Sequence, residues 1–175
     1  MATLIAIVGA ESTGKTALAA ALAEKLGGVA VPELLRGWCD REGRTPRPDE
    51  QAAIAAAQTA AIDAAALNSD VVICDTTSLM TAIYSDFLFQ DASLLTAALA
   101  FHRRCALTLL TALDLPWVAD GLQRDGPHVQ APVDAAIRSA LDSAGVVWHR
   151  VAGEGKARVE AAVQAVLSTQ RASSK

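Results

Sequence analysis

The chain is poor in aromatic residues, which make up 4% of its 175 residues, and it contains only three cysteines. Cys39, Cys74 and Cys105 are odd in number and form no CxxC pair, and the three histidines are equally scattered. Neither a disulfide framework nor a zinc site is therefore indicated, and free thiols in a reducing compartment are expected. No apolar run approaches the roughly 20 residues of a membrane-spanning helix. No Lys or Arg precedes Lys15, so no basic secretory leader is indicated. We therefore expect a cytoplasmic protein that does not associate with membranes.

An excess of positive charge is also missing. The chain has 15 Lys and Arg against 19 Asp and Glu, a formal net charge of −4 at pH 7. This balance gives no general attraction to nucleic acid, and none is expected as a partner. Hydrophobic residues make up 52%, but much of this is alanine, which favours helices. The length fits a single domain over residues 1–170, followed by a frayed tail at 171–175.

Short apolar runs of the kind found in buried parallel strands alternate with stretches of helical periodicity. The strand-like runs are 3–8, 29–32, 70–75, 105–112 and 146–151. The predicted helices are 15–26, 33–39, 48–67, two within 78–103 that are broken near Asp91, 133–145 and 156–170. Strands that alternate with helices predict an α/β fold with a five-stranded, mostly parallel, doubly wound sheet.

The segment GAESTGKT, residues 9–16, follows the first predicted strand and opens the first predicted helix. Its spacing, G-x-x-x-x-G-K-[ST], is that of a phosphate-binding loop, in which glycines let backbone N–H groups curl around a phosphate. The lysine reaches the β and γ phosphates, and the following hydroxyl is placed to ligate Mg²⁺. The alternative is a chance glycine-rich turn before a surface helix. We expect ATP and Mg²⁺ to bind here, with these contacts: Gly9, Ala10, Glu11, Ser12, Thr13, Gly14, Lys15 and Thr16.

Asp75 ends the third apolar run, VVICD. Open α/β sheets bind ligands at the carboxyl ends of their strands, so we expect Asp75 to hold the metal, together with Thr16, or to act in catalysis. The alternative is that Asp75 caps the helix that begins near Ser78.

Two further regions have side chains suited to phosphoryl transfer. Glu33 and Arg36 follow the second strand at helical spacing and are candidates for binding an acceptor, although a local exposed ion pair would have the same spacing. The polar, turn-rich segment after the fourth strand predicts a lid at about 117–130, in which Arg124 stabilises the transferring phosphoryl group. Arg103 and Arg104 are interpreted as ordinary solvated charges.

The segments GAESTGKT, PELLR, ICDTT and PWVADGL, in this order, resemble the ribosylnicotinamide kinase domain of NadR-type proteins and the wider family of small NadR-like AAA-type ATPase/kinase domains. The resemblance spans nearly the whole chain. It implies a P-loop kinase with strand order 2-3-1-4-5 that moves the γ-phosphate of ATP to the ribosyl 5′-hydroxyl of nicotinamide riboside, giving nicotinamide mononucleotide. It also implies a lid at 120–124 and a loop at 151–156 that passes near the adenine.

The cationic pyridinium ring of such an acceptor would stack on an aromatic face, for which Trp38 and Tyr84 are the candidates. An aromatic residue of either kind is more often a core or rim residue than a stacking platform. Two alternative functions stay open. One is a P-loop kinase for another nucleoside, nucleotide or small metabolite, and the other is a regulatory ATP-binding or ATPase module. The lid and the Glu33/Arg36 pair favour an enzyme, because a simple switch requires neither.

Overall fold

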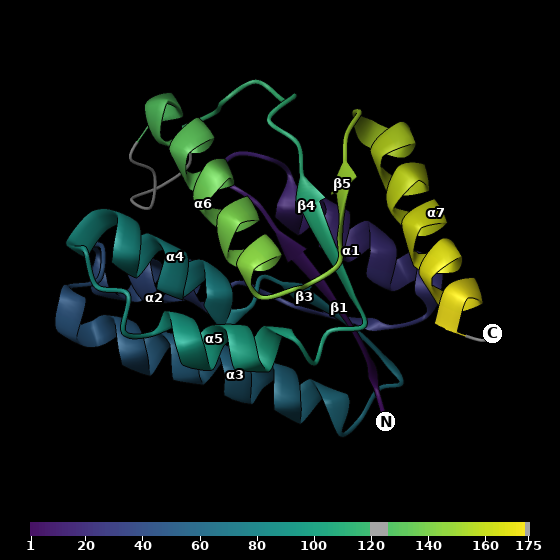
Figure 1. Ribbon diagram of the computed structural model, residues 1–175, viewed down its shortest axis with the longest axis horizontal. Coiled ribbons are helices and arrows are strands. Elements are labelled where there is room, and N and C mark those ends of the chain that lie inside the picture. The colour runs from purple at the N-terminus through teal and green to yellow at the C-terminus, as the bar shows by residue number, and fades with distance from the viewer. Residues whose placement is uncertain (120–125, 174–175) are drawn as a thin grey trace.

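The computed structural model describes residues 1–119 and 126–173, and its centre is a five-stranded sheet in which every pairing is parallel. The strand order is β2-β3-β1-β4-β5, which confirms the predicted α/β fold and its 2-3-1-4-5 order (Figure 1). The strands are β1 (Thr3–Val8), β2 (Val29–Val31), β3 (Val71–Asp75), β4 (Leu107–Thr111) and β5 (Trp148–Val151).

Helices cover both faces of the sheet (Figure 1). One face packs against α1 (Lys15–Leu26) and α7 (Gly155–Ser173). Over the other face lie α3 (Gln51–Ala66), α4 (Ser78–Phe89), α5 (Leu95–His102) and α6 (Gln130–Ser143). Within the described residues, the remaining helical elements are α2 (Leu34–Glu42), which contacts α3, and the 3₁₀ turns η1 (Pro48–Glu50) and η3 (Pro127–Val129).

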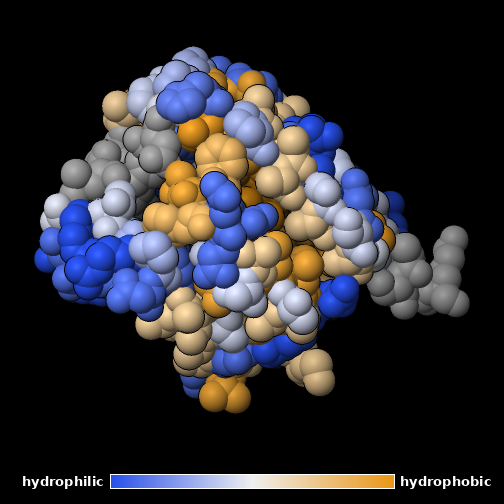
Figure 2. All heavy atoms as spheres, turned by 60° about the vertical axis from the view of Figure 1, so that its left-hand side comes forward, coloured by the Kyte–Doolittle hydropathy of each residue, from blue (hydrophilic) through white to orange (hydrophobic). Residues whose placement is uncertain are grey.

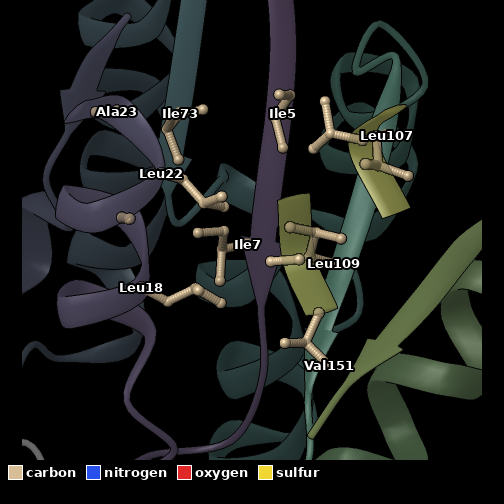
Figure 3. Packing of buried hydrophobic residues seen from close by; sticks show 12 residues of the cluster. Ile5, Ile7, Leu18, Leu22, Ala23, Ile73, Leu107, Leu109 and Val151 are labelled. Atoms are coloured by element: carbon tan, nitrogen blue, oxygen red, sulfur yellow. The ribbon is translucent and has the colours of Figure 1, made fainter. Parts of the chain in front are cut away.

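Alternating side chains of the strands supply the two cores. Ile7 of β1 points toward Leu18 and Leu22 of α1, and Ile5 and Leu109 belong to the same cluster (Figure 3). The intervening strand residues belong to the clusters that α3 to α6 cover on the opposite face. Because both faces of the sheet are buried, the strands have the continuous apolar sequence that predicted them.

The register brings the carboxyl ends of the central strands to one edge of the sheet. Ile7 of β1 is aligned with Asp75 of β3, and Val8 is aligned with Leu110 of β4. On the far side of β3, Val31 of β2 is aligned with Cys74. The segments that follow β1, β2, β3 and β4 therefore begin close together at this edge.

The helix boundaries differ from the predictions at several places. Helix α2 continues to Glu42, and α6 begins at Gln130 rather than 133. Pro132 is tolerated in the first turn of α6 because an amide there has no intrahelical acceptor. Helix α7 reaches Ser173, so residues 171–173 of the expected tail are helical. Among the residues described, no helix combines the length and apolarity needed to cross a membrane.

Candidate active site

The phosphate loop, residues 9–16, has the backbone that its glycines predict. Gly14 is the N-cap of α1 with φ of 75°, and Ser12 also has a positive φ of 58°. At Gly9 the constraint is space, because a β-carbon there would overlap the hydroxyl of Thr111 at the end of β4. The loop thus requires glycine at position 14 for conformation and at position 9 for packing.

Side chains within the loop hold its shape. The Thr13 hydroxyl donates to the Ala10 carbonyl at 2.7 Å and lies 2.7 Å from the Thr111 hydroxyl. The Lys15 ammonium group donates to the same Ala10 carbonyl at 2.8 Å, so it lies over the loop. Thr16, in the first turn of α1, is exposed. The N-terminus of α1, the backbone amides and Lys15 thus concentrate positive potential at one point, which suits a phosphate group.

Asp75 is 2% exposed, and its Oδ1 atom has no hydrogen-bond partner within the described part of the chain. A buried carboxylate oxygen without a partner is unfavourable for stability, so a metal ion or a ligand hydroxyl is the expected partner. Among the described residues, no group of three or more His, Cys, Asp or Glu side chains could hold a metal. One carboxylate with a hydroxyl and substrate phosphates is the usual set for Mg²⁺, and Asp75 and Thr16 fit it.

Both described flanks of the predicted lid contact the phosphate loop. The Val118 amide donates to the Ser12 hydroxyl at 2.8 Å, and the Ser12 hydroxyl lies 3.3 Å from the Val118 carbonyl oxygen. On the other flank, the Gly126 amide donates to the Glu11 carboxylate at 3.1 Å, and the Gln130 side chain donates to the Glu11 carbonyl at 2.8 Å. Arg124 and residues 120–123 and 125 of the predicted lid lie outside the described residues.

A pocket of about 480 Å³ lies between α2 and α3. Glu33, Arg36 and Trp38 line it from the α2 side, and Ala53 and Ile54 are among the α3 residues that line the opposite side. The fold thus brings together three of the four predicted acceptor-binding residues. The fourth, Tyr84, lies on α4 and packs against a separate core cluster.

The Trp38 ring already contacts a flat cation. The Arg44 guanidinium lies 5.0 Å from the ring centroid, and Arg44 makes two hydrogen bonds of 2.7 Å to the Glu50 carboxylate. The hydrogen bond from Arg44 lowers the pKa of Glu50 to about 2. A face of the Trp38 ring is thus in contact with a planar positive group of the protein itself. Figure 2 shows the side of the molecule that bears α2 and α4 turned forward, where hydrophobic areas lie between hydrophilic patches.

Gln58, which sequence analysis did not single out, links this pocket to Asp75. Its side chain is 3% exposed and accepts a hydrogen bond from the Leu34 amide at 2.8 Å. Its amide nitrogen donates to the Pro32 carbonyl at 3.2 Å and to the Thr76 carbonyl at 3.3 Å. The side chain therefore joins the start of α2 to the residue after Asp75. The only sequence signal was a glutamine within an alanine-rich helix.

Behind the end of β3, a buried histidine bridges two hydroxyls. His102 lies 2.9 Å from the Thr77 hydroxyl through Nδ1 and 2.9 Å from the Thr108 hydroxyl through Nε2. Burial lowers the pKa of His102 to about 4, so the ring is neutral at pH 7. Thr77 also caps α4 by accepting from the Leu79 amide, and Asp75 therefore is not needed as that cap.

A sequence model of the AAA domain matches residues 4–158. The chain belongs to this AAA domain family. No curated protein matches the chain in sequence. The chain has the P-loop nucleotide-binding fold. The motif of residues 9–16 lies between β1 and α1, where a phosphate-binding loop is expected.

Solved structures with a similar fold include kinases and NadR. NadR in complex with NR matches with a TM-score of 0.74 at 19% identity, covering 96% of this chain and 51% of that one. Thymidylate kinase from Candida albicans matches at 0.69, with 16% identity and coverage of 97% and 92%. Deoxyadenosine kinase from M. mycoides matches at 0.63, with 13% identity and coverage of 95% and 100%. The chain spans about half the length of the NadR chain, and at these identities the shared property is a P-loop kinase-like fold.

Proposed function

We propose that this protein is an ATP-dependent small-molecule kinase that phosphorylates the ribosyl 5′-hydroxyl of nicotinamide riboside, giving nicotinamide mononucleotide. One observation carries the proposal. In the sheet order β2-β3-β1, the buried Asp75 carboxylate at the end of β3 lies between the phosphate loop after β1 and the α2–α3 pocket after β2. Phosphoryl transfer requires this order: a site for the phosphate donor, an acidic group, and a pocket for the acceptor.

The donor end of the site is built from the phosphate loop. The loop amides and Lys15 bind the β and γ phosphates of ATP, and the Lys15 ammonium group exchanges the Ala10 carbonyl for phosphate oxygens. Thr16 and Asp75 would hold Mg²⁺, which neutralises charge on the β and γ phosphates. The loop at 151–156 lies toward the adenine in this proposal.

The acceptor end is built from α2 and its pocket. Glu33 accepts hydrogen bonds from ribose hydroxyls, Arg36 supports the acceptor with its guanidinium, and the Trp38 ring stacks against the pyridinium. Of the two aromatic candidates, we assign stacking to Trp38, because Tyr84 packs elsewhere. Asp75 orients the 5′-hydroxyl and accepts its proton. Arg124, on the predicted lid, balances charge on the transferring phosphoryl group.

Support for the acceptor comes from the similar NadR folds, which were solved with NR and with NAD and AMP-PNP. The motifs shared with NadR-type kinases fall on this edge of the sheet: the phosphate loop, the PELLR segment that opens α2, and Asp75.

The test is an assay with Mg-ATP and nicotinamide riboside, read by mass spectrometry. Nicotinamide mononucleotide should form in equal amount to ADP, and Lys15→Met should abolish both products while keeping the circular dichroism spectrum. Equal ADP release with and without the riboside, and no phosphorylated product, would instead support the regulatory ATPase alternative. A panel of other nucleosides, nucleotides and small metabolites distinguishes the remaining alternative, since another acceptor would then be phosphorylated in place of the riboside.

A further inference from the structure

Arg158, on the first turns of α7, is a buried charged residue that lies against the phosphate loop. It is 4% exposed, and its Nη2 donates to the Thr13 carbonyl at 2.8 Å and to the Ala112 carbonyl at 3.3 Å. Its Nη1 donates to the Asp114 carboxylate at 2.8 Å and to the Gly153 carbonyl at 2.6 Å. One guanidinium thus joins the phosphate loop, the segment after β4 and the loop after β5.

The cost of burying this charge is offset by these acceptors and by Asp114. Asp114 also accepts from the Gly153 amide at 2.6 Å, so it holds the loop after β5 together with Arg158. The hydrogen bond from Arg158 lowers the pKa of Asp114, which keeps the pair ionised. The planar fork of a guanidinium donates from separate nitrogen atoms on two sides, whereas a lysine ammonium has its three donors on a single nitrogen.

The contact with Thr13 bears on phosphate binding. The Thr13 carbonyl and the Gly14 amide belong to one planar peptide unit, in which C=O and N–H point in opposite directions. When Arg158 holds the carbonyl, the direction of the Gly14 N–H is fixed as well. Gly14 is the position where the loop turns through the left-handed region into α1, so this peptide unit is one that rotates easily without support.

We propose that Arg158 is a positioning residue that fixes the Thr13–Gly14 peptide of the phosphate loop and so prepares the loop for the phosphates of a nucleotide. The inference rests on nucleotide binding in the proposed function and does not depend on the acceptor. Arg158 contacts the loop from behind, through a carbonyl, and is not itself a phosphate ligand. Loss of Arg158 therefore weakens phosphate binding without removing any group that touches the nucleotide.

The test compares wild-type protein with Arg158→Met and Arg158→Lys by calorimetric titration of ATP and of inorganic tripolyphosphate. Arg150→Met is the matched control, because Arg150 makes an ion pair with the buried Asp134 and, within the described part of the chain, no hydrogen bond or ion pair to the phosphate loop. Arg158→Met should weaken binding of both ligands by about tenfold or more, by the same factor. Arg158→Lys should weaken both by a smaller factor, and Arg150→Met should leave both affinities unchanged even if its melting temperature falls.

Three results would overturn the proposal. The first is an unchanged ATP affinity in folded Arg158→Met. The second is a loss of ATP affinity with unchanged tripolyphosphate affinity, because the effect would then come from the base side of the site. The third is a wild-type affinity of Arg158→Lys for ATP and tripolyphosphate. This variant also tests the proposal if Arg158→Met does not fold. The titrations measure binding and not turnover. Failure to phosphorylate nicotinamide riboside would therefore refute the proposed acceptor, whereas the role of Arg158 is tested by the ATP and tripolyphosphate affinities alone.

Discussion

Gly9 lies so close to Thr111 that a β-carbon at position 9 would overlap the Thr111 hydroxyl. The same hydroxyl is within 2.7 Å of Thr13, so three residues of the loop and of β4 share one small space. Gly9→Ala should therefore distort the loop and weaken ATP binding by about fivefold to a hundredfold, as overpacking costs about 1–3 kcal/mol. Titration of the purified variant with ATP measures this directly.

A double variant separates the overlap from other effects. Thr111→Ala removes the hydroxyl that collides, so Gly9→Ala combined with Thr111→Ala should bind ATP better than Gly9→Ala alone. The losses of the two single variants would then be strongly non-additive. Simple additivity would show that the contact between positions 9 and 111 is not what requires glycine.

Asp75→Asn should lower activity and raise stability together. The substitution removes a buried charge whose Oδ1 has no partner in the described residues, so the melting temperature should rise by a few degrees. It also removes the proton acceptor and metal ligand of the proposed mechanism, so kcat should fall by about a hundredfold or more. Thermal melts and steady-state kinetics on one preparation check both. A variant with normal kcat, or with a lower melting temperature, would contradict the role assigned to Asp75.

Gln58→Glu should raise the KM for the acceptor and leave the KM for ATP unchanged. The new carboxylate still accepts from the Leu34 amide, but its second oxygen faces the Pro32 and Thr76 carbonyls, which lose their donor. We expect the acceptor KM to rise by about tenfold, the order of a lost hydrogen bond plus repulsion, while the KM for ATP stays the same. Gln51→Glu, two turns earlier on α3 and also buried, is the control and should leave both values unchanged. Equal changes in both KM values for Gln58→Glu would indicate general loss of structure.

The stability of the protein should fall between pH 6.5 and pH 4. Burial lowers the pKa of His102 from 6.5 to about 4, so in this range the unfolded chain takes up a proton that the folded chain does not. The free energy of unfolding should therefore decrease as the pH falls, by about 1.4 kcal/mol per unit and about 3 kcal/mol in all. Urea denaturation between pH 5 and 7 measures the slope of the unfolding free energy against pH. This range lies above the pH at which ordinary carboxylates titrate, so the slope reports mainly on histidine. His102→Gln should flatten the slope, and an unchanged slope in that variant would assign the effect to another group.

Arg124→Ala should lower kcat by about a hundredfold with little change in ATP affinity, because its contact would form mainly in the transition state. Arg103→Ala and Arg104→Ala are the controls. Arg104 pairs with Asp63 at 2.6 Å and Arg103 donates to the Ala144 carbonyl, so both have structural contacts away from the phosphate loop. Normal kcat in Arg124→Ala would move the role to another residue of the lid.

The elements and the phosphate loop were predictable from the sequence because their causes are local. Apolar runs that end in Gly9 and Asp75 fixed β1 and β3, and the spacing from Gly9 to Lys15 predicted the loop. The 2-3-1-4-5 order came from the family resemblance. The grouping of the candidate acceptor residues was predictable in part, since helical spacing placed Glu33 and Arg36 together. That Trp38 lines the same pocket while Tyr84 does not required the packing of α2 and α4.

The sequence by itself determined the periodicities, the glycine positions and the nucleotide-binding motif, because backbone conformation and apolar alternation depend on residues a few positions apart. Only the tertiary structure decided which polar residues are buried within the site. Gln58 and Arg158 look like ordinary polar positions of alanine-rich helices, yet their partners Leu34 and Thr13 are 24 and 145 positions away in the chain. A hydrogen bond over such distances exists only when the sheet has brought the two segments together, and no local pattern encodes it.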